Sequence, residues 1–331
     1  MVIGGETMRE IILSECVEIL QRYNFTVSQT FGRSCFDILA RKGSRKYLIK
    51  VLKNIDSLSY EQSLELLKLS KILGATPLII GIRTRNLPME NGVVYERHSI
   101  KAITLKTFEA YLEGNPPIVY AGRGGFFVNI DGETLRTVRE KLNISVGELA
   151  EYSNVSRKMI YKYEQNLANP TIEVALRIEE YLDTPLIRGI PLEVDKKEIS
   201  DISIEGDKER YRSERENDFK LYVIDIFNQL GFHTTEVKRA PFDAIVEKED
   251  VETEEYNLCT LVLTNIEERE TEETRQKMLI VSQLSSVLNS SSLLVLEKED
   301  THSIDYVKTI NVRELERMDD ASDLLEYIAS K

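Results

Sequence analysis

The sequence contains few cysteines and histidines, and neither type is clustered. The three cysteines are Cys16, Cys35 and Cys259, and the three histidines are His98, His233 and His302. A closed zinc site needs four convergent ligands, and no local stretch of this sequence supplies two of them. We therefore expect no metal site and no cofactor, and we expect the cysteines to be buried, reduced thiols.

The sequence also lacks a long apolar run and a secretion signal. The longest apolar run, at about residues 77–82, has the length of a strand and is too short to span a bilayer. The first residues do not combine a basic stretch with a following apolar one, as a signal peptide does. We expect a soluble, cytoplasmic protein without a membrane partner.

Positive charge is scarce overall but unevenly distributed. The net charge of −13 would disfavour DNA binding if it were spread evenly, because a DNA-binding surface must neutralise phosphates. Residues 1–130 carry 17 Lys and Arg against 12 Asp and Glu, residues 131–190 carry 8 against 10, and residues 191–331 carry 18 against 34. The acidic excess therefore lies in the C-terminal part, and the overall charge says little about a DNA-binding surface elsewhere.

Two breaks divide the chain. Gly122, Gly124 and Gly125 indicate a turn or hinge, and residues 193–218 are dense in charge and poor in large apolar side chains. We expect an N-terminal α/β block at 1–117, a linker at 118–130, a helical block at 131–190, a charged linker at 191–217 and an acidic C-terminal α/β block at 218–331.

The two outer blocks resemble each other. Each is predicted to run helix, three strands, helix and strand, followed by a short strand and a terminal helix. The dipeptides Phe36-Asp37 and Phe242-Asp243 fall at the same place in each block. We interpret the pair as an internal duplication of one α/β unit, at a spacing of about two hundred residues that is too long for a solenoid.

The helical block carries the most specific signal. Ser145-Val-Gly-Glu148 has the spacing of a capping box, in which the Ser oxygen accepts the amide of residue 148 while Glu148 reaches back. Ser153-Asn154-Val155 is predicted to form a tight turn, with Asn154 suited to a left-handed backbone, and Ser156 to cap the following helix. This succession predicts a helix-turn-helix, whose second helix lies in the major groove of DNA.

The exposed residues at the start of that second helix are the expected DNA contacts. Arg157 could form a bidentate contact with guanine, Lys158 and Lys162 suit phosphates, and Tyr161 could meet a thymine methyl group or a sugar. The predicted DNA-binding residues are Ser145, Ser156, Arg157, Lys158, Tyr161 and Lys162. The glycine-rich stretch around Arg123 could instead form an arm in the minor groove, but a linker is the preferred interpretation.

Several residues of the helical block resemble the pattern of Cro/C1-type (Xre-like) helix-turn-helix domains. The matching residues are Leu149-Ala150, Asn154-Val155-Ser156, Ile160, Tyr163-Glu164 and Asn169-Pro170-Thr171. The resemblance implies a structural ion pair between Arg139 and Glu164. The sequence departs from the family at Val146-Gly147, where many members have Gln, and at Glu179, which replaces a small residue.

The wider arrangement resembles a family of archaeal HTH-type transcriptional regulatory proteins. In that family, a run like Val119-Tyr-Ala-Gly-Arg-Gly-Gly-Phe-Phe-Val128 leads through Ile130-Asp-Gly132 into the helix-turn-helix. The resemblance covers most of the chain, and more loosely its C-terminal third. It implies DNA binding and regulation but no particular operator.

The outer blocks are similar to the PD-(D/E)XK nuclease fold, and the first resembles its Holliday-junction-resolvase branch. In that family an Asp and a Glu, one strand apart, hold magnesium, and a nearby Lys assists the water. Asp37 matches the Asp, but the strand reads Lys50-Val51-Leu52-Lys53 without the Glu. The C-terminal block keeps Asp243 but has Leu261-Val262-Leu263-Thr264 on the next strand.

A lone Asp cannot supply the oxygen ligands that the metal requires, so we expect both blocks to be catalytically inactive. Such blocks would serve for dimerisation or ligand sensing. Alternatively, Asp37, Lys50 and Lys53 form a simple ion-pair cluster at the surface.

The predicted fold is a multidomain α+β or α/β protein. It has an all-α helix-turn-helix between two restriction-endonuclease-like units. The predicted function is sequence-specific binding of double-stranded DNA to regulate transcription, without enzymatic activity. We expect a homodimer, because one recognition helix reads too few base pairs, and we leave an unidentified small-molecule effector open. The alternatives are a metal-dependent nuclease that uses Asp37, and an adaptor or coactivator that binds protein partners through its helix-turn-helix.

Overall fold

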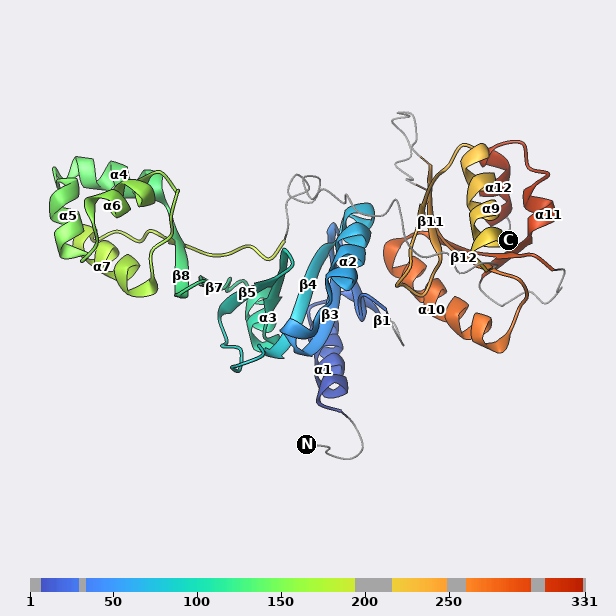
Figure 1. The fold of residues 1–331 in the computed structure, drawn as a ribbon, viewed down its shortest axis with the longest axis horizontal. Coiled ribbons are helices and arrows are strands. Elements are labelled where there is room, and N and C mark those ends of the chain that lie inside the picture. The colour runs from blue at the N-terminus through green and yellow to red at the C-terminus, as the bar shows by residue number, and fades with distance from the viewer. Residues whose placement is uncertain (1–6, 30–33, 194–215, 249–259, 299–306, 330–331) are drawn as a thin grey trace. The chain divides into compact units, whose positions relative to one another are not determined.

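The computed structural model describes residues 7–29, 34–193, 216–248, 260–298 and 307–329 (Figure 1). Within these ranges, no helix is both long enough and apolar enough to cross a membrane. The predicted charged linker at 191–217 lies almost entirely outside them, as does Cys259. The chain divides into two compact units. Unit 1 comprises Met1–Ile19, Val51–Tyr60 and Thr76–Asp195, and unit 2 comprises Leu20–Lys50, Glu61–Ala75 and Lys196–Lys331.

Unit 1 contains the later strands of the N-terminal α/β block. After helix α1 (Met8–Arg22) and the short helix η1 (Ile55–Ser57), the chain forms β4 (Thr76–Arg83), β5 (Val93–Arg97), β6 (Ile100–Ile103) and α3 (Leu105–Leu112). Strand β6 pairs in parallel with β4 and antiparallel with β5. Apolar side chains of all three strands are buried. The sequence predicts strands at the positions of β4 and β6 but not at that of β5.

The stretch predicted as a linker at 118–130 has regular structure. Strands β7 (Val119–Gly122) and β8 (Gly125–Ile130) form an antiparallel hairpin, whose turn needs the positive φ angles of Gly124 (94°) and Gly125 (148°). Strand β8 also pairs with β9 (Ile187–Arg188), which follows the last helix of the helical block. The hairpin is thereby joined to that block by strand pairing as well as by the chain.

Four helices form the helical block: α4 (Gly132–Lys141), α5 (Val146–Tyr152), α6 (Arg157–Glu164) and α7 (Ile172–Leu182). Apolar residues at helical spacing meet in one core, which β8 closes. Its buried members are Val128, Ile130, Leu135, Leu149, Ala150, Ile160, Tyr163, Ala175, Ile178, Leu182 and Leu186. Each large aliphatic side chain buried here stabilises the block by roughly 1.5–3 kcal/mol relative to exposure. All four helices contribute side chains to this core.

Unit 2 begins with the first strands of the N-terminal block. Strands β1 (Thr26–Gln29), β2 (Ile38–Lys42) and β3 (Arg45–Asn54) are antiparallel, with Ser28 opposite Leu39 and Ile38 opposite Ile49. Helix α2 (Tyr60–Leu73) lies almost wholly in this unit, and β3 continues into unit 1 after Lys50.

The C-terminal block repeats this order. It consists of α9 (Glu216–Gln229), β10 (His233–Glu236), β11 (Ala244–Lys248), β12 (Thr260–Glu267), α10 (Glu272–Leu288), β13 (Ser291–Leu296), β14 (Lys308–Asn311), α11 (Val312–Leu315) and α12 (Ala321–Ala329). The sheet order is β10-β11-β12-β13-β14, antiparallel up to β12 and parallel after it. Helices α9 and α12 cover one face of the sheet and α10 the other (Figure 1). The predicted elements are present in both blocks, with the additional strand β5 in the N-terminal block and a second helix at the end of the C-terminal block.

The two α/β blocks contact each other within unit 2. Helix α10 of the C-terminal block lies against β1 and β2 of the N-terminal block. From the other side, the Lys68 ammonium on α2 donates a hydrogen bond to the Glu236 carbonyl at the end of β10, at 2.6 Å. The Cys35 amide, two residues before Asp37, donates to the Arg239 carbonyl at 2.7 Å. The contact is therefore reciprocal, because the helix of each block meets the strand edge of the other.

Candidate DNA-binding site

Three helices of the helical block begin at hydroxyl caps. The Oγ atoms of Ser145 and Ser156 accept hydrogen bonds from the amides three residues later, at 3.1 and 3.3 Å, and Thr171 caps α7 in the same way. The predicted capping box at Ser145 is only half formed. The Glu148 carboxylate accepts a hydrogen bond from the Tyr181 hydroxyl at 2.7 Å, and so ties α5 to α7.

The turn between α5 and α6 has the predicted conformation. Asn154 is left-handed, with φ at 57°, and the Val155 amide donates to the Ala150 carbonyl at 3.0 Å. Buried Ala150 and Ile160 let the two helices approach closely. The turn fixes α6 across α5 with its first residues facing away from the core.

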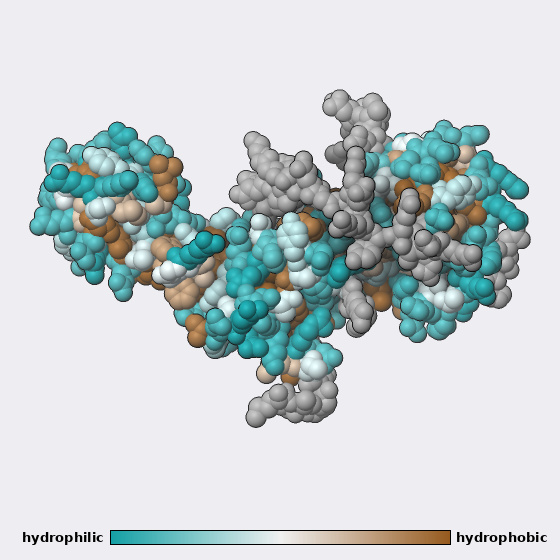
Figure 2. Space-filling model, viewed as in Figure 1, coloured by the Kyte–Doolittle hydropathy of each residue, from teal (hydrophilic) through white to brown (hydrophobic). Residues whose placement is uncertain are grey.

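The start of α6 presents the predicted contact residues to solvent. Arg157 and Lys158 are exposed beside the Ser156 cap, the Tyr161 side chain follows one turn later at 52% exposure, and Lys162 is half-buried next to it. In the space-filling view the visible face of the helical block is mostly hydrophilic (Figure 2). Three cations and a phenol thus share one end and one side of a rigid helix.

The ion pair between Arg139 and Glu164 holds α4 against the end of α6. Arg139 Nε lies 2.5 Å from Glu164 Oε1, and Nη2 lies 3.3 Å from Oε2, so the contact is bidentate. The two side chains are 10% and 5% exposed. Arg139 also donates to the Ile144 carbonyl at 3.0 Å. The carboxylate raises the pKa of the Arg139 guanidinium, which therefore stays charged.

Sequence reasoning missed the contacts that fasten the helical block to its strands. The Asn169 amide donates to the Tyr120 hydroxyl at 2.8 Å and to the Asn129 side chain at 3.0 Å, so it joins the loop after α6 to the hairpin. The Glu179 carboxylate accepts the amides of Leu186 and Ile187, at 2.5 and 2.8 Å. The departure from a small residue at 179 was the one signal in the sequence, and the structure shows that the carboxylate anchors β9.

In each nuclease-like block, a lysine ammonium forms an ion pair with the Asp that matches the nuclease position. In the N-terminal block the Lys50 ammonium lies 3.1 Å from Asp37 and donates to the Ser34 carbonyl at 2.6 Å. The predicted ion pair is present, but both side chains are buried and it is not at the surface; Lys53 is exposed further along β3. In the C-terminal block the Lys220 ammonium on α9 lies 2.7 Å from Asp243, which also accepts the Ile266 amide.

These donor sets do not suit a divalent metal. Magnesium requires several oxygen ligands, and in each block the Asp that matches the nuclease position is already paired with an ammonium. Among the residues that the structure describes, no group of three His, Cys, Asp or Glu side chains could hold a metal ion. The residues present therefore do not fit the metal that the nuclease fold implies.

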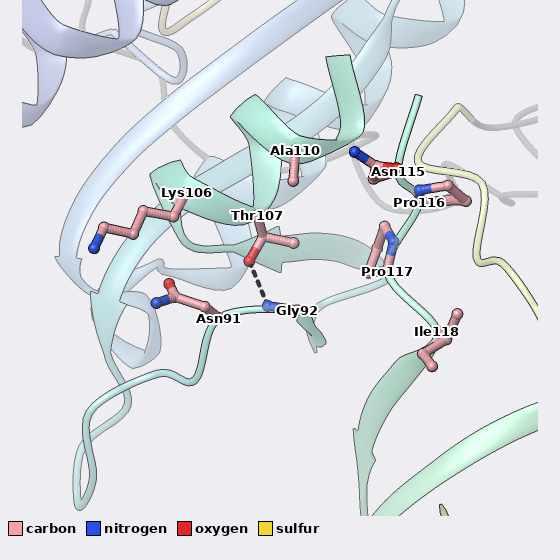
Figure 3. Close-up of a pocket in the computed structure, with 9 residues that line it drawn as sticks. All are labelled: Asn91, Gly92, Lys106, Thr107, Ala110, Asn115, Pro116, Pro117 and Ile118. Atoms are coloured by element: carbon pink, nitrogen blue, oxygen red, sulfur yellow. Dashed lines mark hydrogen bonds between the residues drawn. The ribbon is translucent and has the colours of Figure 1, made fainter. Parts of the chain in front are cut away.

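A small hollow lies beside α3, lined by Asn91, Gly92, Lys106, Thr107, Ala110, Asn115, Pro116, Pro117 and Ile118 (Figure 3). Its buried hydroxyl, on Thr107, accepts the Gly92 amide at 2.9 Å and is bonded to the Thr104 hydroxyl at 2.8 Å. Lys106, Asn115 and Pro116 are exposed at its rim. The polar atom at its base is thus already bonded within the fold, and the hollow gives no argument for an effector site.

Comparison with known proteins places these observations in a family. The model of the PD-(D/E)XK superfamily domain matches residues 9–117, and that of a helix-turn-helix matches residues 135–187. A protein of Methanococcus maripaludis (strain C6), named "Putative HTH-type transcriptional regulatory protein", is 55% identical over 326 residues, which cover 98% of both chains. Proteins of the same name are 52% identical in Methanocaldococcus jannaschii, with 98% of this chain and 97% of the other covered, and 37% identical in Pyrococcus abyssi, with 97% of each covered.

The matches run through both α/β blocks and the helix-turn-helix between them, at identities well above what a shared fold alone requires. This chain therefore belongs to the family of archaeal proteins that bear the name of HTH-type transcriptional regulatory protein.

Proposed function

We propose that this protein regulates transcription by binding double-stranded DNA in a sequence-specific manner, with α6 in the major groove. The observation that carries the proposal is the exposed start of α6, where Arg157 and Lys158 follow the Ser156 cap after a tight turn from α5. A short helix, a tight turn and a second helix with free N-terminal side chains are the parts that this mode of binding uses. The names of the relatives support the regulatory role.

Each exposed residue has a role that follows from its chemistry. The planar fork of Arg157 matches O6 and N7 of guanine, whereas Lys158 and Lys162 are point charges suited to phosphates. Tyr161, which is 52% exposed, would contact a thymine methyl group or a sugar. Ser145 and Ser156, at the starts of α5 and α6, lie where phosphates approach helix N-termini. The DNA contacts would therefore come from both helices of the motif.

Selection of bound sequences from random DNA by the full chain tests the proposal. We expect one recurrent sequence to be enriched, and Arg157→Ala to lose about 1–3 kcal/mol of discrimination at one base pair. Lys158→Ala should weaken binding to all sequences and reduce the salt dependence by about one phosphate contact. Arg177→Ala, an exposed charge on α7 outside the site, is the matched control. Salt-sensitive binding without any sequence preference would refute specific regulation.

We further propose that the protein acts as a homodimer, because paired half-sites multiply the specificity of one recognition helix. Light scattering of the protein bound to its selected sequence measures the number of copies. Two copies on a site with two half-sites are expected, and one copy on a single half-site would contradict the dimer.

We also propose that the α/β blocks do not cleave DNA. The support is the ammonium that lies against each Asp, Lys50 against Asp37 and Lys220 against Asp243. Supercoiled DNA incubated with the protein and magnesium or manganese should remain uncut. Metal-dependent nicking that disappears in Asp37→Ala would make the protein a nuclease instead.

A further inference from the structure

Gly147 is the second residue of α5, and a side chain there would collide with Arg157. A Cβ atom placed on Gly147 would lie 2.9 Å from both Nε and Nη2 of Arg157, and 3.1 Å from its Cζ. Carbon atoms do not approach a guanidinium so closely. The Arg157 guanidinium therefore rests across the first turn of α5, in space that only a glycine leaves open.

No charged partner holds the guanidinium in this place. Among the residues that the structure describes, Arg157 makes no ion pair and no side-chain hydrogen bond, and it is exposed. It is also the first residue of α6, where the helix end carries partial positive charge and does not attract a cation. The guanidinium therefore lies beside Gly147, and its donor groups stay available to an acceptor outside the protein.

We propose that Gly147 is a specificity-determining residue, which acts by positioning Arg157 for its base. The inference rests on the proposed function, because it assigns to Gly147 the orientation of a contact proposed there. A planar fork that already points in one direction loses less freedom on binding than a mobile one, and its two donors discriminate best when they are aligned with both guanine acceptors. A side chain at 147 displaces the fork and removes this alignment.

The position allows an unusually clean test, because the substitution should not harm the fold. Gly147 has an ordinary helical backbone, and alanine is a better helix former than glycine, so Gly147→Ala should leave the melting temperature of the full chain unchanged or raise it. The atoms that it displaces are the far end of a flexible side chain. Gly147→Gln is the larger second variant, and Thr137→Ala on the exposed side of α4 is a control with a similar gain in helix propensity.

The experiment measures the affinity of the full chain for its selected sequence and for every single-base variant of that sequence. We expect Gly147→Ala to bind the selected sequence about tenfold more weakly, or 1.4 kcal/mol, and to lose preference at the same base pair as Arg157→Ala. The variant with both substitutions should bind no more weakly than Arg157→Ala alone. Thr137→Ala should bind as the unaltered chain does.

Other results separate this inference from the proposed function. If the unaltered chain selects a sequence but Gly147→Ala binds it with the same preferences, Gly147 does not position Arg157 and the inference is wrong. Losses that simply add in the double variant would overturn it as well, because Gly147 would then act without Arg157. If the unaltered chain selects no sequence at all, the proposed function fails first and this inference fails with it.

Discussion

The ion pair between Arg139 and Glu164 provides the most direct test of how the helical block is held together. Replacing Arg139 with Met keeps much of the side-chain volume but leaves the Glu164 carboxylate, 5% exposed, without its partner. Removing one member of a buried pair typically costs about 3–5 kcal/mol, because the remaining charge is both desolvated and unpaired. We expect a loss of this size in the free energy of unfolding of the helical block.

Two further variants isolate the cause of that loss. Arg136→Met removes the exposed pair with Glu140, whose side chains are 65% and 54% exposed, and should change the stability far less because water screens this pair. The double variant Arg139→Met with Glu164→Leu removes both buried charges and should recover most of the stability. A deficit of about 1 kcal/mol should remain, because the Ile144 carbonyl loses the hydrogen bond from Arg139.

Hydrogen exchange of the full chain, followed by mass spectrometry, gives the opening free energy of peptides from α4 and α6. The reasoning is refuted if Arg139→Met costs no more than Arg136→Met, or if the double variant is no more stable than the single one. Either result would mean that apolar packing alone holds α4 against α6.

Three other predictions follow from buried or shifted groups. Hydrogen bonds from Thr134, together with Arg188, lower the pKa of Asp131 to about 2. The charged carboxylate therefore stabilises the fold fully above about pH 4, and this stabilisation is lost as the pH falls toward 2. Urea denaturation should show Asp131→Asn less stable by about 1–2 kcal/mol at pH 7, a difference that shrinks below pH 4; a constant difference would contradict it. Asp37→Asn should cost about 3–5 kcal/mol by leaving the buried Lys50 charge unpaired, while the affinity for DNA stays the same; a variant as stable as the parent would contradict this. Burial raises the pKa of the Cys16 and Cys35 thiols to about 12, so peptide mapping should find both unmodified by iodoacetamide at pH 8 until urea unfolds the protein; rapid labelling of the folded chain would show them accessible.

The helices of the helical block could be predicted because their signals are local. An N-cap hydroxyl accepts a hydrogen bond from an amide three residues later in the same segment. Ser145, Ser156 and Thr171 therefore indicate where the following helices begin. The left-handed turn at Asn154 is equally local. The predicted return contact of Glu148 in the capping box was nevertheless wrong. Its carboxylate bonds Tyr181, on a helix more than thirty residues away, which a local pattern cannot show.

The hairpin at 118–130 could not be predicted because its stability comes from elsewhere in the chain. Three glycines interrupt it, so neither strand shows a long alternation of apolar and polar residues. What fixes it is the loop after α6, whose Asn169 bonds Tyr120 and Asn129, and the short strand β9. The glycine signal indicated the turn correctly but could not show that strands flank it.

The sequence also could not show that the side chains of Asp37 and Lys50 are buried. Charged residues usually indicate a solvated surface, and a surface cluster of Asp37, Lys50 and Lys53 was one interpretation of the sequence. However, β3 is buried on both faces from Tyr47 to Val51. The sequence of this strand, with one lysine among apolar residues, would fit a strand with one exposed face equally well. Lys50 is tolerated there because Asp37 and the Ser34 carbonyl satisfy its charge and two of its donors.

The reciprocal contact of the two α/β blocks bears on where the proposed homodimer can form. Helix α10 of the C-terminal block covers β1 and β2, while Lys68 on α2 reaches the end of β10. A second molecule could use these edges only by displacing a segment of the same chain, whose effective concentration is far higher than that of a separate partner. We therefore expect a dimer that pairs two recognition helices to form through other surfaces.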